Sequence, residues 1–422
     1  MELLEFLNKS VNEYFASKEI SNILDNHGFT RLYMSEKWNL QNGTNYYVVF
    51  DETSIIAFKM GLKSHSNDES KHFQIIASHL DSPVIKIKPI GIIHQKEFDK
   101  LNIEVYGGPI LQSWFDKPLG IAGRVMVKEN DEIKSILVKS SHPLAIIPSA
   151  PIHLKKDVSL NPQKDLLPLI GMNSVNDVHE LIEKEFNISK ENILSFDLGL
   201  FNCTDAAMVG VNNDFITSAR IDNLESAYAT LMGFLNAEGS NISVYACFHN
   251  EEVGSNTKQG ADSTILVDVL SRLVDSSVLP QALSKSFIIS CDNAHGYHPN
   301  YPELYDPTNF CELNKGIVIK HNANFRYTTD ALSEAILVEI LNKANLSYQH
   351  YTNRSDIRGG STLGAISQSH LSIASVDIGL AQLSMHTNYE TAGAKDYFDL
   401  IKLAEKFYNV NIIIDKKIIV EE

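Results

Sequence analysis

The sequence predicts an α/β protein in which helices cover both faces of a mostly parallel sheet and a β-rich domain is inserted. The chain has 422 residues, which is more than one hydrophobic core usually supports. After residue 203, short apolar runs alternate with amphipathic helical patterns, as in parallel sheets joined by helices. Between Pro83 and about Cys203, proline and glycine repeatedly interrupt short β-like runs. We therefore expect a discontinuous domain of residues 1–85 and 204–422, with residues 86–203 inserted as a β-rich domain.

The elements expected before the insertion are one helical stretch and three strands. A helical periodicity runs from the start of the chain to about residue 26. Three later segments are short, apolar and rich in β-branched or aromatic residues, as strands tend to be. These segments are residues 45–50, 54–59 and 73–78.

The inserted segment is expected to form a compact domain of short strands. Pro118, Pro143 and Pro148 break its β-like runs, as does Gly107-Gly108-Pro109. The strands expected between these breakers are residues 84–93, 102–105, 123–127 and 135–138.

The last part of the chain is expected to alternate strands with helices. Apolar residues spaced by three or four positions from Leu224 to Leu235 mark the buried face of one helix. Further helices are expected at residues 330–344 and 395–408. The strands expected among them are residues 242–248, 287–291, 316–320 and 372–378.

Charge and composition exclude several classes of partner. The formal net charge of −16 argues against nucleic acid or an anionic membrane surface as a partner. A hydrophobic fraction of 44% with 21% charged residues is typical of a globular protein. No apolar run approaches the roughly 18 residues of a membrane span. The four cysteines form no CxxC pair and no disulfide framework, so we expect a cytoplasmic protein.

Two adjacent carboxylates, Glu251 and Glu252, follow the apolar run of residues 242–248. Their charges are costly at the end of a buried strand unless a positive group lies beside them. Neighbouring residues of an extended chain point to opposite sides, so one carboxylate can bind a metal while the other faces a water. The pair therefore predicts a hydrolytic metal site.

Other apolar runs also end in residues that can bind metal. We expect these ends to meet, because ligands of open α/β sheets bind outside the carboxyl ends of the strands. Two histidines with several carboxylates suit zinc, and this many carboxylates indicate two ions that share one of them. Asp81 is placed to fix the tautomer of the His79 imidazole. The other candidates are Asp222, Asp292 and His386, beside Glu251 and Glu252.

A glycine-rich run at residues 359–364 is a rival site that fails two tests. A nucleophile elbow needs glycine two residues after the serine, where Leu363 stands. A phosphate-binding loop needs Gly-Lys-Ser or Gly-Lys-Thr at its end, which is also missing. We interpret the run as a turn that lines the crevice, with Asp356 and Arg358 as candidate substrate-pocket residues.

Ordered motifs along nearly the whole chain resemble the M18 family of aminopeptidases, the aspartyl aminopeptidase group. The central motifs are Ser78-His79-Leu80-Asp81-Ser82-Pro83, Tyr106-Gly107-Gly108-Pro109-Ile110, Arg220-Ile221-Asp222-Asn223-Leu224, His249-Asn250-Glu251-Glu252-Val253-Gly254-Ser255 and Asp292-Asn293-Ala294-His295. Residues 114–119, 122–125, 160–165 and 298–300 extend the resemblance.

The resemblance implies a two-metal peptidase. Two divalent ions per chain are expected, most commonly Zn²⁺, with Mn²⁺ or Co²⁺ as alternatives. Asp222 would bridge the ions, Glu251 would be the general base, and Asp81 would support catalysis. The expected metal ligands are His79, Asp222, Glu252, Asp292 and His386.

The resemblance also implies self-association, with the inserted residues 86–203 as a dimerisation domain, and a substrate preference. His153 matches a histidine that the family lends to the active site of a neighbouring subunit, and dimers would build a dodecamer. Lys320 matches a lysine that contacts acidic P1 side chains. However, the run after His386 lacks the arginine of the acidic-specific members, so a preference for neutral residues stays open.

An aminopeptidase that releases N-terminal residues from peptides, Asp or Glu above others, is the leading hypothesis. One alternative is a catalytically silent assembly or cargo protein with the same fold, although a silent protein needs no general base at Glu251. A second is a related di-zinc amidohydrolase, although the inserted domain fits the aminopeptidase family better.

Overall fold

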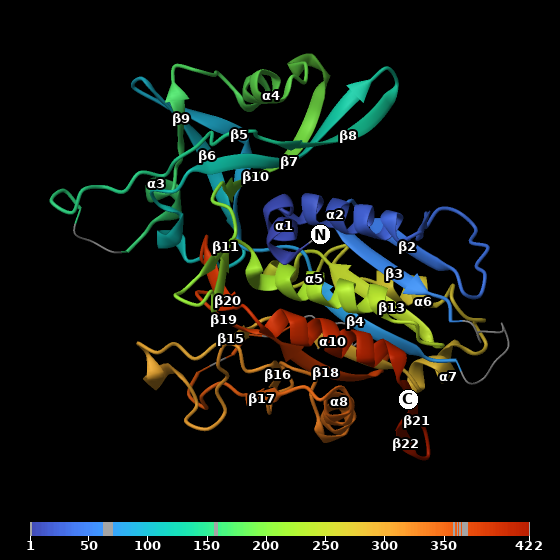
Figure 1. Cartoon of the computed structure of the whole chain (residues 1–422). Coiled ribbons are helices and arrows are strands. Elements are labelled where there is room, and N and C mark those ends of the chain that lie inside the picture. The colour runs from blue at the N-terminus through green and yellow to red at the C-terminus, as the bar shows by residue number, and fades with distance from the viewer. Residues whose placement is uncertain are drawn as a thin grey trace.

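The computed structural model describes residues 2–61, 71–155, 159–357, 359–360, 362, 364 and 370–421. In these ranges the strands form sheets of nine, six and five strands and a two-stranded hairpin (Figure 1). The six-stranded sheet lies at one end of the molecule, at the top of Figure 1, and the other elements form the larger body below it. No helix in the described ranges is long and apolar enough to cross a bilayer.

The nine-stranded sheet forms the centre of the larger body. Its order is β1-β2-β3-β13-β4-β14-β18-β16-β17. Five neighbouring pairs are parallel and three are antiparallel. The strands are β1 (Thr30–Leu32), β2 (Asn45–Phe50), β3 (Ser54–Lys59), β4 (Phe73–His79), β13 (Ile242–Phe248), β14 (Phe287–Cys291), β16 (Ile317–Lys320), β17 (Tyr348–Tyr351) and β18 (Ala374–Gly379).

Helices cover both faces of this sheet because successive residues of its strands point to opposite sides. In β13, Tyr245 packs with the core on one face, and its neighbours Val244 and Ala246 pack with the core on the other. The first face carries α1 (Leu3–Lys9), α2 (Glu13–Asn26), α5 (Ile221–Asn236), α8 (Ala331–Ala344) and α10 (Asp396–Asn409). The second carries α6 (Ile265–Leu270) and α7 (Leu279–Ser284).

The six-stranded sheet is antiparallel and has its own apolar core, which includes residues of α4 (Val178–Phe186). All of its strands fall between Val84 and Asn202. In sheet order they are β8 (Glu132–Lys139), β7 (Leu119–Glu129), β10 (Ile193–Asn202), β5 (Val84–Gln95), β6 (Phe98–Tyr106) and β9 (Leu169–Met172). The short helix α3 (Pro162–Asp165) precedes β9.

A five-stranded sheet lies at the left of the larger body in Figure 1, below the six-stranded sheet. Its order is β11-β12-β20-β19-β15, formed by segments that are far apart along the chain. The strands are β11 (Ala207–Val209), β12 (Phe215–Ser218), β20 (Glu390–Gly393), β19 (Ala381–Leu383) and β15 (Ala294–His295). The chain then ends in a hairpin of β21 (Asn411–Ile414) and β22 (Ile418–Glu421).

The structure confirms the predicted α/β class with helices on both faces of a mostly parallel sheet. The bounds of β2, β3, β13 and β14 match the expected strands. The domain boundaries at residues 85/86 and 203/204 stay a prediction.

Three expectations about local structure were wrong. The first helical stretch is two helices, because the side chain of Asn12 accepts a hydrogen bond from Phe15 N and starts a new helix. The strands of the insertion are longer than expected, since β6 spans Phe98–Tyr106 and β7 spans Leu119–Glu129, where strands at residues 102–105 and 123–127 were expected. The five-stranded sheet was not expected, because its strands are too short to stand out in the sequence.

Candidate metal centre

Three neighbouring strands at the middle of the large sheet bring the first candidate residues together. β13, β4 and β14 are parallel, so their carboxyl ends lie at the same edge of the sheet. His79 is the last residue of β4 and pairs with Phe248, the last residue of β13. Glu251 and Glu252 lie in the short helical turn after β13, and Asp292 directly follows β14.

The remaining two candidate ligands come from the side of the five-stranded sheet. Asp222 lies at the start of α5, where the backbone is not yet helical. His386 lies in the loop between β19 and β20 and has a left-handed backbone with φ of 67°. Because β12 leads into α5 and pairs with β20, these two segments converge on the same edge.

The candidate ligands form two groups that share Asp222. Its Oδ1 lies 3.5 Å from Nε2 of His79, and its Oδ2 lies 3.4 Å from Nε2 of His386. Asp292 Oδ1 is 3.3 Å from Nε2 of His79, and Glu252 Oε2 is 3.4 Å from Nε2 of His386. A tetrahedral ion with bonds of about 2.0 Å separates its ligand atoms by about 3.3 Å. Each group therefore has the spacing of a divalent metal site.

Buried charge in the cluster supports the same interpretation. Oδ1 of Asp222 and Oε1 of Glu252 are buried and accept no hydrogen bond in the described part of the chain. Burial raises the pKa of Glu251 to about 8, with the charge of Asp292 adding to the effect against the opposing charge of His79. Burial and the charge of Asp222 raise the pKa of Glu252 well above its ordinary value. A divalent cation would supply the missing positive charge, so the donor set fits a metal such as zinc.

The two histidines respond to the same carboxylates. Burial alone would lower the pKa of His79, yet hydrogen bonding with Asp222 and Asp292 raises it well above its ordinary value. At His386, burial would also lower the pKa, but the hydrogen bond with Asp222 and the charge of Glu252 raise it to about 10. The carboxylates and imidazoles thus compete for a proton at the positions that a metal ion would occupy.

Asp81 is buried behind this cluster and holds the Glu251-Glu252 turn. Its Oδ1 accepts a hydrogen bond from Glu251 N at 3.2 Å, and its Oδ2 accepts one from Glu252 N at 3.1 Å. The hydroxyl of Tyr106 donates to Oδ2 at 2.6 Å. The main-chain oxygen of Asp81 lies 3.0 Å from Nδ1 of His79, closer than its carboxylate at 3.5 Å. Asp81 therefore orients both the imidazole and the two glutamates.

Glu390 is a site residue that the sequence did not single out. Its side chain is buried and accepts hydrogen bonds from Asp222 N at 3.0 Å and from His386 N at 2.7 Å. Burial, together with the charge of Asp222, raises its pKa to about 8. The signal available in the sequence was an acidic residue four positions after His386, directly before the short run Thr391-Ala392-Gly393.

A glycine turn from the six-stranded region lies against the cluster. Gly107 has φ of 71°, and a Cβ atom at this position would lie 3.2 Å from Cβ of Glu252. The carbonyl oxygen of Gly108 lies 3.2 Å from Nδ1 of His386, and Ile110 N donates to the carbonyl oxygen of His386. The motif Tyr106-Gly107-Gly108 thus lets the backbone pass close to the candidate ligands.

Two of the residues predicted to bind substrate, Lys320 and Asp356, lie in different surroundings. Lys320 is buried, and its ammonium donates to the main-chain oxygens of Asp292 at 2.6 Å and Asn293 at 3.2 Å. Asp356 is exposed and paired with Arg354 at 2.7 Å. Arg358 lies outside the described residues, as does Leu363.

His153 lies on an exposed turn of the inserted region and contacts none of the candidate ligands within the described residues. Its neighbours Ile152 and Leu154 are 74% and 83% exposed. An exposed apolar pair on a protruding turn is typical of a surface that another chain covers.

Comparison with known proteins identifies relatives along nearly the whole chain. The family model described as aminopeptidase I zinc metalloprotease (M18) matches residues 6–408. A probable M18 family aminopeptidase 2 from Clostridium novyi is 42% identical over 429 aligned positions, covering 97% of this chain and 98% of the relative.

Solved structures share the fold. A chain in the cryo-EM structure of the Ape4 and Nbr1 complex is 33% identical with a TM-score of 0.92, covering 96% of this chain and 84% of that chain. A mApe1 dodecamer from S. cerevisiae is 25% identical with a TM-score of 0.84, covering 96% of this chain and 95% of that chain.

We predict that Glu390→Gln weakens metal binding although Glu390 is not itself a proposed ligand. Glutamine has one acceptor oxygen, so the N–H of either Asp222 or His386 loses its partner. Loss of such a supporting contact typically costs about 10- to 100-fold in metal affinity. Zinc competition with a chromophoric chelator measures this loss. Glu405→Gln, which alters a carboxylate that binds Asn236 on the surface, is the control and should leave the affinity unchanged.

Proposed function

Because this chain belongs to the M18 family of zinc metalloaminopeptidases, we propose that it removes N-terminal residues from peptides with two divalent ions at the candidate metal centre. The observation that carries the proposal is the position of Asp222, whose two oxygens face two different histidines. One ion would lie between His79, Asp292 and Asp222, and the other between Glu252, His386 and Asp222. Zinc is the favoured ion, with Mn²⁺ or Co²⁺ as alternatives.

The chain's own residues divide the work of hydrolysis. Bound divalent ions supply Lewis acidity, which lowers the pKa of water and polarises the scissile carbonyl. Glu251 would take the proton from the attacking water and pass it to the amine of the leaving peptide. Its carboxylate has an oxygen within 4.8 Å of ligand atoms of His79 and Glu252, so it lies beside the proposed ions. Asp81 fixes this position through Glu251 N.

The preferred P1 residue is proposed to be Asp or Glu. Lys320 is the residue assigned to this preference, and its Nζ lies 3.5 Å from the carboxylate of Asp292. The same ammonium also supports the loop of Asp292 from behind. These two roles, specificity and support of a metal ligand, predict different results when the lysine is replaced.

Self-association is part of the proposal. The S. cerevisiae relative is described as a dodecamer, and the exposed turn with Ile152 and Leu154 offers an apolar contact for a second subunit. His153 on this turn would reach the metal centre of the neighbouring chain. All four cysteines are free thiols, which suits the reducing cytoplasm in which we place the protein.

Glu251→Gln should retain both ions and lose about 10²- to 10⁴-fold in kcat, because an amide cannot accept the proton from water. Metal content by mass spectrometry and turnover of an aminoacyl anilide measure the two effects separately. Unchanged turnover would show that another group is the base. No turnover in the wild-type protein with any substrate would favour a silent assembly protein instead.

A substrate panel separates the two roles of Lys320. Anilides of Asp, Glu, Leu and Met are compared in the wild-type protein and in Lys320→Met, which keeps most of the apolar stem. Recognition of a P1 carboxylate by Lys320 predicts a loss of kcat/KM for Asp and Glu only. Support of Asp292 predicts an equal loss for all four substrates. Faster cleavage of Leu and Met by the wild-type protein would contradict the acidic preference.

Mixed assemblies test whether His153 acts in a neighbouring subunit. His153→Ala and Glu251→Gln should each have low activity alone. After dissociation and reassembly of a mixture, sites with an intact Glu251 can meet an intact His153 from the other variant. We expect activity to recover in the mixture and not in either variant treated alone. Equal activity before and after mixing would refute action across subunits.

A further inference from the structure

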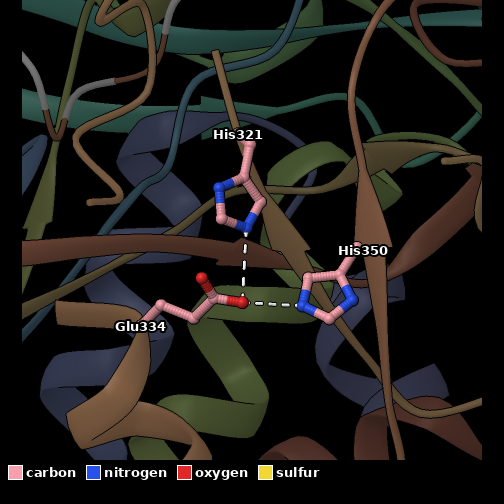
Figure 2. Close-up of side chains that lie close together, drawn as sticks. All are labelled: His321, Glu334 and His350. Atoms are coloured by element: carbon pink, nitrogen blue, oxygen red, sulfur yellow. Dashed lines mark hydrogen bonds and ion pairs between the residues drawn. The ribbon is translucent and has the colours of Figure 1, made fainter. Parts of the chain in front are cut away.

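Three metal-competent side chains meet at the edge of the large sheet, apart from the candidate metal centre. His321 directly follows β16, His350 lies in β17, and Glu334 lies in the first part of α8. The strands β16 and β17 are parallel neighbours, with Ile319 paired with His350. Figure 2 shows that both imidazoles point toward the same carboxylate.

The distances between the ligand atoms of His321, Glu334 and His350 are close to those in a metal site. Nε2 of His350 lies 2.7 Å from Oε1 of Glu334, and Nε2 of His321 lies 3.6 Å from the same oxygen (Figure 2). All three ligand atoms lie within 4.8 Å of one another. Ligand atoms of a tetrahedral zinc ion are about 3.3 Å apart. Small rotations of the partly exposed His350 and Glu334 side chains would make room for an ion between them.

A buried nitrogen atom of His321 lacks a hydrogen bond among the described residues, which is consistent with a bound ion as its partner. Nε2 of His321 is buried and makes no hydrogen bond with any described residue, although it faces the carboxylate. Burial lowers the pKa of His321, against the opposing charge of Glu334. A neutral imidazole is the form that binds metal, so burial prepares this ring as a ligand.

The surrounding elements hold the trio in place. Asp330 and Ser333 form a capping box that fixes the start of α8, and Glu334 lies in the first turn of this helix. The N–H of His321 donates to the carbonyl oxygen of Tyr351, which ties the end of β16 to β17. Backbone hydrogen bonds therefore fix β16 relative to β17, and α8 packs against the sheet through its buried apolar residues Ile336, Leu337 and Ile340.

We propose that His321, Glu334 and His350 form an additional binding site for a divalent ion of the zinc class, separate from the candidate metal centre. Two imidazoles and one carboxylate favour zinc over Mg²⁺ or Ca²⁺, which prefer oxygen ligands. Three protein ligands leave one position of a tetrahedral ion open, and the partial exposure of the trio lets water fill it.

The ion would fasten α8 to the edge of the large sheet. His321 adjoins Lys320, whose ammonium bonds to the main-chain oxygen of Asp292. An ion at this site therefore holds the end of the strand that supports the loop of Asp292. Its role is structural, and it takes no part in the proton transfer assigned to Glu251.

Metal counting tests the proposal on the full-length protein. Metal-depleted protein is dialysed against zinc and desalted, and the ions per chain are counted by mass spectrometry. The wild-type protein should hold one ion more than His350→Asn and one more than Glu334→Gln. The second variant is nearly isosteric, so it keeps the packing of α8 while losing the charge. His370→Asn is the control, because His370 and Asp262 form a similarly exposed pair at 2.8 Å, and no third ligand lies beside this pair among the residues that the structure describes.

Two outcomes would overturn the proposal. The first is an equal ion count in the wild-type protein and both variants. The second is an anomalous difference map of zinc-soaked crystals with no peak between the three side chains, which would leave the trio a hydrogen-bonded cluster only. Failure of the proposed function is distinguishable, because loss of the central ions lowers the count in the control as well. The difference between the control and the two variants reports this site alone.

Discussion

The structure depends on how it holds many carboxylates at one buried edge of its central sheet. Glu251, Glu252 and Asp292 follow adjacent strands, and Asp222 reaches them from the start of α5. Like charges this close in a poorly hydrated place repel strongly, and no arrangement of the carboxylates alone relieves that repulsion. Divalent ions would turn the repulsion into attraction, which explains why the residues can be gathered at all.

The ligands are positioned through their main chain as much as through their side chains. Asp81 and Glu390 accept hydrogen bonds from four backbone N–H groups, those of the residues proposed as base and ligands. Lys320 adds a cation against the carbonyl oxygen of Asp292. Such contacts hold each ligand in place before any ion arrives, so less ordering is needed when it binds.

The sequence was sufficient for the parts of the fold and site that depend on local pattern. Buried strands such as β13 and β14 are continuous apolar runs, and a carboxylate at the end of such a run is visible without a structure. Glu390 could not be found in this way, because its role comes from a pairing between β12 and β20, which lie far apart in the chain. Burial of Lys320 is equally non-local, since it depends on how β16 sits beside β18 and the Asp292 loop.

The glycine turn that follows β6 affects whether the six-stranded region could be exchanged between related proteins. The inserted sheet begins and ends beside the larger body, which makes it look like a module that could be transplanted. Yet Gly107 and Gly108 lie against Glu252 and His386, so part of the lining of the candidate metal centre comes from the segment that carries the six-stranded sheet. A chimera joined near Val84 and Asn202 would inherit the candidate ligands from one parent and the glycine turn beside them from the other. Exchange of the six-stranded region between relatives is therefore limited by the small space between this glycine turn and Glu252.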